Sequence, residues 1–283
     1  MPVITIVGAG NLAGSLSVAL RGAGYRIDQI VSQSPAASLR RARRLAREVG
    51  TTGVAAARVQ IRADIIWFCV PDGVIARAAA SLTDAADWQG KVALHSSGAL
   101  TSDELAVLRE RGAAVASVHP LMTFVQGSRP SLAGVSFAIE GDPKAVRTAR
   151  AIVLRLRGES FAISKWQKEA YHAWGMFASP LFTALLAAGE RVAGAAGISR
   201  KSARERMLPI LRQTLANYAN LGAGASFSGP IARGDVTTVG KHLKVLLEVP
   251  ELREIYAALA RAALRDLPAK NRSVLRRLLS RTE

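Results

Sequence analysis

Residues 3–14 read VITIVGAGNLAG and decide the expected fold. The β-branched run Val3–Val7 is typical of a fully buried parallel strand, and a helical pattern follows the glycines. A strand, a glycine turn and a helix form the context in which Gly-x-Gly-x-x-Gly/Ala binds a dinucleotide. In that motif Gly8 would allow the tight turn, Gly10 would let the backbone approach a pyrophosphate, and Ala13 would let the helix lie close to the strand. The alternative is an ordinary glycine-rich turn.

The composition indicates a globular protein with room for two domains. The chain has 283 residues, of which 49% are hydrophobic and 21% are charged. Its one cysteine, Cys69, lies in the apolar run 65–70, where we expect it to be buried and unable to form an intrachain disulfide. No secretory signal is visible, and the longest uncharged stretch, 173–189, is too short for a membrane span. We therefore expect a cytoplasmic protein without membrane association.

The formal net charge of +17 raises the question of a polyanionic partner. However, no aromatic residues alternate with the arginines, and no nucleic-acid motif is present. A solvated basic face is therefore favoured over a nucleic-acid surface. The arginines concerned lie in two predicted helices, as Arg40, Arg41, Arg43, Arg44 and Arg47, then Arg272, Arg276, Arg277 and Arg281.

Predicted strands alternate with predicted helices through the first part of the chain. The strands are expected at 3–7, 26–31, 64–70, 91–95, 114–118, 136–140 and 160–163. This alternation predicts an α/β fold with a doubly wound, Rossmann-type, mainly parallel sheet over residues 1–163. Helices alone are expected afterwards, at 165–195, 200–221 and 235–247, with Asp235 as an N-cap. Residues 164–283 are therefore expected to form an all-α domain.

Polar and small residues follow several of these strands. Ligands of doubly wound sheets bind outside the carboxyl ends of the strands, so these residues would meet at one edge. The free N–H groups at the start of the first helix would face the phosphates of a dinucleotide. The residues expected to contact the cofactor at this edge are Gly8, Gly10, Asn11, Leu12, Val70, Pro71, Asp72, His95 and Ser96.

The end of the second strand bears on the choice of cofactor. NAD-specific proteins place an acid about 20 residues past the glycines, to bind the ribose 2′-hydroxyl. Here the sequence has Ser32 and Ser34 at that place, with Arg40 and Arg41 shortly after them. Hydroxyls and guanidinium groups suit a 2′-phosphate better, so the expected cofactor is NADP (NADPH). The alternative is that the arginines only solvate the helix.

Three side chains at the start of the second domain could act on a substrate. Lys168 and His172 are four residues apart and share one helix face, with Tyr171 beside them. A reductase that uses a nicotinamide needs a group that protonates or polarises the acceptor atom. We predict Lys168 for this role, with Tyr171 and His172 as its neighbours. The equally weighted alternative is an exposed Lys168 and a structural, half-buried His172.

Two further residues are candidates for binding substrate. His119, like His95, ends a strand at the ligand edge, and neither has carboxylates or cysteines at metal-ligand spacing, so no metal site is expected. The loop 229–235 presents Arg233 between two glycines, where it could hold a carboxylate or phosphate. A rigid turn with a capping aspartate is the alternative for this loop.

Taken together, these motifs resemble those of a known family. The matching sequences are GAGN (8–11), VPD (70–72), HSSGA (95–99), HPL (119–121), KEAYH (168–172) and GPIARGD (229–235). The chain resembles the Rossmann-like proteins that carry the domain of unknown function 2520, which are related to pyrroline-5-carboxylate reductase, ketopantoate reductase and the NADP oxidoreductases that use a deazaflavin.

The resemblance implies NADP in the first domain, a second domain like the C-terminal one of 6-phosphogluconate dehydrogenase, and homodimer formation through that domain. The Trp166-x-Lys168 stretch resembles the one that places the catalytic lysine of ketopantoate reductase, with His172 in place of its asparagine. The glycine-rich phosphate motif of pyrroline-5-carboxylate reductases is not evident in the second domain.

The expected function is an NADP-dependent oxidoreductase that transfers a hydride between a nicotinamide and a small C=O or C=N substrate in the cleft between the domains. Two alternatives stay open: a non-catalytic NADP(H)-binding regulatory protein and a polyanion-binding protein. A deazaflavin partner is also compatible with the phosphate-binding loop.

Overall fold

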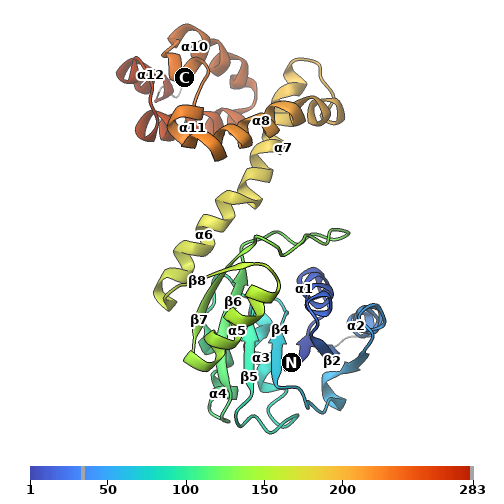
Figure 1. Ribbon diagram of the computed structural model, residues 1–283. Coiled ribbons are helices and arrows are strands. Elements are labelled where there is room, and N and C mark those ends of the chain that lie inside the picture. Colours follow the sequence, from blue (N-terminus) through green and yellow to red (C-terminus); the bar gives the residue numbers. More distant parts are fainter. Residues whose placement is uncertain (33–35, 281–283) are drawn as a thin grey trace. The chain divides into compact units, whose positions relative to one another are not determined.

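The structure is a computed structural model that describes residues 1–32 and 36–280. It divides into two compact units, Met1–Ser179 and Pro180–Glu283 (Figure 1). The sequence had placed the division after Ile163. The contacts place it later, because α6 (Lys168–Ala178) packs on the first unit through Lys168 and Tyr171, which are both buried.

The first unit is built on one sheet of eight strands. Their order is β3-β2-β1-β4-β5-β6-β7-β8, and all neighbours are parallel except β6 and β7. The predicted doubly wound, mainly parallel sheet is therefore confirmed. The strands are β1 (Val3–Val7), β2 (Arg26–Ser32), β3 (Thr52–Ala55), β4 (Ile65–Phe68), β5 (Val92–His95), β6 (Ala114–Pro120), β7 (Ser136–Gly141) and β8 (Glu159–Ala162). The sequence did not predict β3, because this short edge strand has no buried residue.

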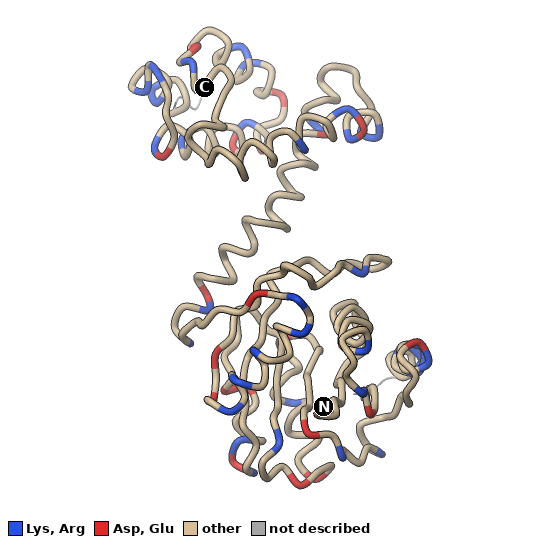
Figure 2. Tube along the Cα trace, in the orientation of Figure 1, with Lys and Arg blue, Asp and Glu red and all other residues tan. Residues whose placement is uncertain are grey.

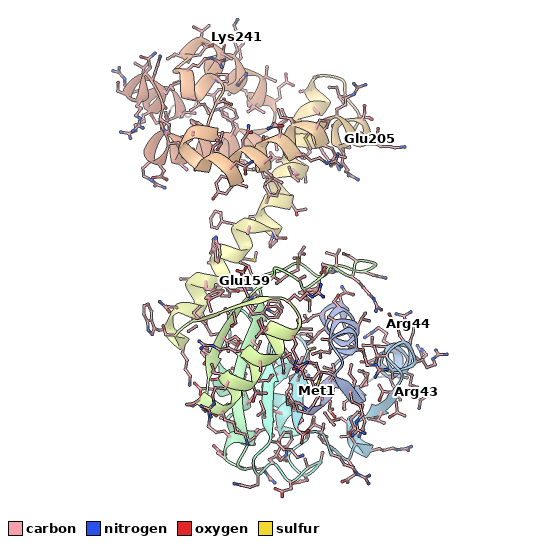
Figure 3. The ribbon with its side chains drawn as sticks, viewed as in Figure 1. Met1, Arg43, Arg44, Glu159, Glu205 and Lys241 are labelled. Atoms are coloured by element: carbon pink, nitrogen blue, oxygen red, sulfur yellow. The ribbon has the colours of Figure 1, made fainter. Side chains whose placement is uncertain are left out.

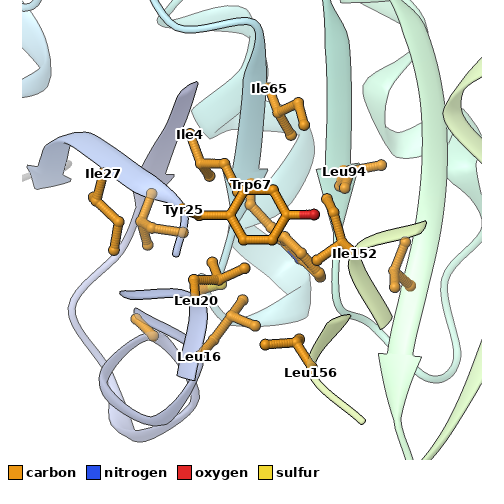
Figure 4. Close-up of a cluster of buried hydrophobic side chains, with 14 of the residues drawn as sticks. Ile4, Leu16, Leu20, Tyr25, Ile27, Ile65, Trp67, Leu94, Ile152 and Leu156 are labelled. Atoms are coloured by element: carbon orange, nitrogen blue, oxygen red, sulfur yellow. The ribbon is translucent and has the colours of Figure 1, made fainter. Parts of the chain in front are cut away.

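Alternation along the strands gives the sheet two apolar faces. On one face, Trp67 packs with Leu16 and Leu20 of α1 (Asn11–Gly22) and with Ile152 of α5 (Pro143–Arg155), around the ring of Tyr25 (Figure 4). The other face carries a second cluster, which includes Ile66, Phe68, Trp88 and Leu105. The remaining helices of this unit are α2 (Ala36–Glu48), α3 (Ile75–Ala80) and α4 (Ala106–Arg109). A sheet covered on both sides leaves its strand ends as the place for a ligand.

The second unit is helical throughout its regular elements. It contains α7 (Pro180–Ala195), α8 (Arg200–Ser226), α9 (Pro230–Arg233), α10 (Val236–Val245), α11 (Pro250–Asp266) and α12 (Arg272–Leu279). Asp235 caps α10 by accepting the N–H of Thr238 at 2.9 Å, as predicted. The helix expected over 165–195 is instead interrupted at Ser179, because Pro180 cannot continue the backbone hydrogen bonding.

Over residues 1–32 and 36–280, no single helix is long and apolar enough to cross a membrane. The helical segments 165–195 and 200–233 satisfy the length and composition criteria only when taken together, and they form a bent pair.

Candidate functional site

The glycine turn after β1 has the geometry that its sequence predicts. Gly8 has φ +117°, and a Cβ atom there would lie 2.3 Å from the carbonyl oxygen of Cys69, so only glycine fits. Gly10 is open, since no atom lies within 4 Å of the position of its Cβ. The chain then enters α1 at Asn11, and Leu12 packs partly on the core below. The first N–H groups of α1 have no partner within the helix and are available to an anion.

A cavity of about 860 Å³ begins at this turn, within the size range of ligand sites. Arg41 and Arg44 of α2 line it, and Figure 3 shows Arg44 extending from that helix. Arg40, the residue predicted from sequence, does not line it. The full lining comprises Ala9, Gly10, Asn11, Gly14, Arg41, Arg44, Leu45, Glu48, Gln126, Gly127, Ser128 and Arg129.

The segment between β6 and β7 forms another wall of this cavity. Arg129 in this segment makes an ion pair with Glu48 of α2, in which Nη2 lies 2.7 Å from Oε2. Asn11 donates a hydrogen bond to the carbonyl of Phe124 at 3.2 Å. The sequence gives no signal for this contribution, because an irregular segment carries no periodic pattern that would place it over the glycine turn.

Two serines at the end of β2, Ser32 and Ser34, were predicted to contact the cofactor. Ser32 is 1% exposed, and its buried hydroxyl has no hydrogen-bond partner among the described residues. Ser34 lies outside the described residues, so its predicted contact with the cofactor stays a prediction.

Lys168 is the most deeply buried charged residue of this sheet edge, with 0% of its side chain exposed. Its ammonium group donates to the hydroxyl of Ser117 at 2.7 Å and to the carbonyl of Ser97 at 3.1 Å. Ser117 also donates to the Ser97 carbonyl, at 3.0 Å. The alternative of an exposed surface lysine is therefore wrong, whereas the role of Lys168 as proton donor stays a prediction.

Carboxylates lie near this buried ammonium group. Burial lowers the pKa of Lys168 to about 8, while the charges of Glu140 and Asp72 oppose that shift. Glu140 is itself buried and accepts hydrogen bonds from the backbone N–H and the hydroxyl of Ser102, at 2.6 and 2.9 Å. At neutral pH Lys168 is thus still charged, in a region with little water.

The loop after β5 is held by its own side chains. His95 is fully buried, accepts the N–H of Ser97 at Nδ1 and donates from Nε2 to the carbonyl of Thr101. Burial lowers the pKa of His95 to about 4. Since both of its ring nitrogens are engaged, His95 braces the loop, and its predicted contact with the cofactor stays a prediction.

Other predicted cofactor residues surround this loop. The hydroxyl of Ser97 donates to Asp72 at 2.8 Å, and Ser96 accepts a hydrogen bond from the indole of Trp67 at 2.8 Å. Val70 packs partly against the core, whereas Pro71 is exposed at the strand end. The structure thus brings Asp72 and Ser96 to the edge where the sequence expected them.

His119, Tyr171 and His172 form an aromatic cluster at the same edge. Nδ1 of His119 is hydrogen-bonded to the hydroxyl of Tyr171 at 2.8 Å, and its ring lies edge-on to those of Tyr171 and His172. Nε2 of His119 has no hydrogen-bond partner within the described part of the chain. Gly98 lies against it: a Cβ atom at Gly98 would be 2.9 Å from Nε2 of His119 and 2.7 Å from the His172 ring. Tyr171 is buried, while His119 and His172 are half-buried.

The surroundings of His119 and Tyr171 favour the neutral form of both side chains. Burial, followed by the charge of Lys168, lowers the pKa of His119 to about 4. Burial raises the pKa of Tyr171 to about 12. At neutral pH a protonated phenol therefore faces a neutral imidazole. When the phenol donates to Nδ1, Nε2 carries the ring proton and can donate it in a hydrogen bond to an oxygen or nitrogen.

Arg233, the predicted substrate clamp, is exposed at the end of α9 in the second unit. Among the described residues, no group of three or more His, Cys, Asp or Glu side chains is arranged to hold a metal ion. Lys and Arg are spread over many elements of both units (Figure 2). Part of this charge is structural, because Arg272 and Arg276 donate to carbonyls at the end of α11.

These features define a Rossmann-type α/β protein with a cavity at its glycine turn, and comparison with known families agrees. A model of a Rossmann-like domain matches residues 2–120, and one described as Domain of unknown function (DUF2520) matches residues 135–263. The chain therefore joins a Rossmann-like domain to a DUF2520 domain, and the resemblance found in the sequence is confirmed. No curated protein matches the chain.

Solved structures share the fold over nearly the whole length. A candidate NADP oxidoreductase from Bacteroides fragilis has a TM-score of 0.77 and 22% identity, over 92% of this chain and 97% of its own. A protein from Thermotoga maritima has a TM-score of 0.71 and 24% identity, over 92% of this chain and 96% of its own. A pyrroline-5-carboxylate reductase from Coxiella burnetii has a TM-score of 0.59 and 17% identity, over 99% of both chains. At these identities the likeness establishes the fold.

Proposed function

We propose that this protein is an NADP-dependent oxidoreductase that transfers a hydride between the nicotinamide and a small C=O or C=N substrate. The observation that carries the proposal is the cavity of about 860 Å³ at the glycine turn, with Arg41 and Arg44 in its lining. The His119–Tyr171 pair lies at the same edge of the sheet. The similar structures named above as an NADP oxidoreductase and a pyrroline-5-carboxylate reductase support the same class of reaction.

The residues around the cavity fit a dinucleotide phosphate. Gly10 leaves room for close approach, and the start of α1 offers backbone N–H groups to a pyrophosphate. Arg41 and Arg44 would bind the 2′-phosphate, which a guanidinium group suits by charge and geometry. When bound, NADPH would supply the hydride.

The chain's own contribution to the chemistry would come from the aromatic cluster. A substrate oxygen or nitrogen that gains negative charge during reduction is stabilised by a positioned hydrogen-bond donor. Nε2 of His119 is suited to that role, since its Nδ1 is fixed by Tyr171 and the ring is half-buried. His172, on the same helix as Tyr171, would border the substrate.

The test is calorimetric titration of the purified protein with NADPH and NADH, followed by a turnover assay on a panel of small ketones, aldehydes and imines. We expect NADPH to bind at least about tenfold more tightly than NADH, a difference of about 1.4 kcal/mol. Binding with turnover supports the oxidoreductase. Binding without turnover across the panel would favour the regulatory alternative, and binding of neither nucleotide would refute the proposal.

We also propose that the second unit forms a homodimer, as the family resemblance implied. Large apolar side chains are exposed on α7 and α8, among them Val192, Leu215, Tyr218 and Leu221. Exposed apolar surface of this kind is typical of an interface between subunits. Light scattering should give twice the mass of one chain, and Leu215→Glu should reduce it to the mass of a monomer. A wild-type protein that is monomeric at micromolar concentration would refute this.

A further inference from the structure

We propose that Lys168 is a positioning residue: its ammonium group holds the Ser97–Gly98 loop against β6 and thereby sets the position of His119, which is the side chain that meets the substrate. This inference rests on the proposed function for its meaning, but it assigns roles that differ from those expected from the sequence. There, Lys168 was the proton donor and His119 only a substrate contact.

The burial of Lys168 keeps its ammonium group away from a substrate. A group that donates a proton to substrate must come within hydrogen-bond reach of it. The Lys168 side chain is 0% exposed, and its ammonium group is already bonded to Ser117 and to the carbonyl of Ser97. Because both bonds of its ammonium group go to protein atoms, Lys168 acts on its protein neighbours and not directly on a substrate.

A chain of hydrogen bonds and packing contacts connects Lys168 to His119. Ser117 and His119 are two residues apart on β6, so both side chains point to the same face of the sheet. The carbonyl of Ser97 accepts hydrogen bonds from both Lys168 and Ser117, which ties the loop after β5 to β6. Gly98, the next residue of the loop, lies directly against Nε2 of His119. Without the ammonium group, only the hydrogen bond from Ser117 would tie the Ser97 carbonyl to β6, and the loop beside His119 would be held less firmly.

The positive charge of Lys168 also affects the protonation of His119. His119 is surrounded by Lys168 and His172 from α6, by His95 from β5 and by Asp72 after β4. Lys168 adds a like charge to the effect of burial, and both disfavour the protonated ring. At the acidic pH where His119 takes up a proton, Lys168 is fully charged. Removing that charge should therefore raise the pH at which His119 titrates.

The experiment is an NMR titration of the histidine rings in the full-length, ¹⁵N-labelled protein. The chain has four histidines, so each ring can be assigned from the signal lost in a His→Gln variant. The variants compared are Lys168→Met, Lys168→Arg and the matched control Lys165→Met. Lys165 lies three residues before Lys168, but it is paired with Asp103 and has no part in the His119 cluster.

We expect Lys168→Met to raise the titration midpoint of His119 by about one pH unit, the size of effect that one close charge produces. Lys168→Arg keeps the charge and should leave the midpoint near that of the wild type, as should Lys165→Met. A residue with a merely structural role would not separate Met from Arg in this way. An unchanged midpoint in a folded Lys168→Met protein would overturn the inference, and so would an equal shift in Lys168→Arg.

If Lys168→Met does not fold, Ser117→Ala decides the matter, because it removes the partner of the ammonium group and leaves the lysine in place. The ring shifts of His119 should then change while those of His242, in the second unit, stay constant. Unchanged His119 shifts would overturn the inference. Since the titration needs neither cofactor nor substrate, its result is separate from that of the NADPH titration, which tests the proposed function.

Discussion

The arginines of α2 provide the sharpest test of cofactor choice. Arg41 and Arg44 line the cavity at the glycine turn, whereas Arg40 and Arg43 are exposed on the same helix and do not line it. The double variant Arg41→Gln/Arg44→Gln should therefore weaken NADPH binding. The control Arg40→Gln/Arg43→Gln removes the same charge from the same helix without touching the cavity.

The size of the effect follows from the exposure of these side chains. A hydrogen bond to a charged group contributes about 1.5–3 kcal/mol, and exposure to water reduces this to about 1 kcal/mol for each arginine. The loss of both should cost about 2 kcal/mol, which corresponds to roughly 30-fold in the dissociation constant. NADH, which lacks the 2′-phosphate, should bind both double variants about as well as it binds the wild type.

Calorimetry at fixed ionic strength measures all four combinations of variant and nucleotide. If the control pair weakens NADPH binding as much as the cavity pair does, the effect is one of net charge, and the assignment of Arg41 and Arg44 to the 2′-phosphate is wrong. If the cavity pair weakens NADH binding as strongly as NADPH binding, the assignment is also wrong, because the arginines would then bind a part that both nucleotides share.

Three further predictions concern the fold itself. Gly8→Ala should lower the free energy of unfolding by about 3 kcal/mol or more, because the new Cβ would meet the Cys69 carbonyl oxygen and the residue has a positive φ. Gly10→Ala should change stability little, since the position of its Cβ is open. Thermal unfolding of both variants checks this. Burial raises the pKa of Cys69 to about 12, so a thiol reagent should label it only on unfolding, and fast labelling of the native protein would contradict this. Hydrogen bonding to Lys165 lowers the pKa of Asp103 from 3.8 to about 2, so this pair should stabilise the fold above about pH 4 and lose that effect as pH falls towards 2. Chemical unfolding of the wild type and of Asp103→Asn across that range measures the difference.

The sequence was sufficient for the fold because the fold depends on local, periodic patterns. The run Val3–Val7 and the glycines after it set the first strand, the turn and the helix, and the alternation of buried strands set the sheet. The edge strand Thr52–Ala55 carries no such pattern, since edge strands bury little. The choice between Arg40 and its neighbours was also beyond reach, because it depends on the rotation of α2 about its axis, which the start of the helix determines.

The sequence indicated which residues gather at this sheet edge but not how they are hydrogen-bonded to one another, because the partners of a buried polar group are set by the tertiary fold. From the sequence, Lys168 could be assigned only by its chemical type, as a proton donor. Its actual partners, Ser97 and Ser117, lie 71 and 51 residues away, so no local pattern could reveal them. Ser97 lies in a loop and Ser117 lies within β6, and neither carries a sequence pattern that indicates a buried ammonium group as its partner.

The pairing of His119 with Tyr171 bears on the reaction that this edge can perform. A histidine with a pKa of about 4 is a poor proton carrier near neutral pH, but its neutral ring is a stable hydrogen-bond donor at Nε2. Such a donor stabilises negative charge on a substrate atom without first having to lose or gain a proton itself. We therefore expect the rate of reduction to vary little between about pH 5.5 and 7, above the pKa of His119 and below that of Lys168. Tyr171→Phe should lower kcat more than it raises KM, because it frees Nδ1 to take the proton away from Nε2. A rate that follows a single group titrating near pH 6.5 would instead mean that a histidine acts there as a proton donor.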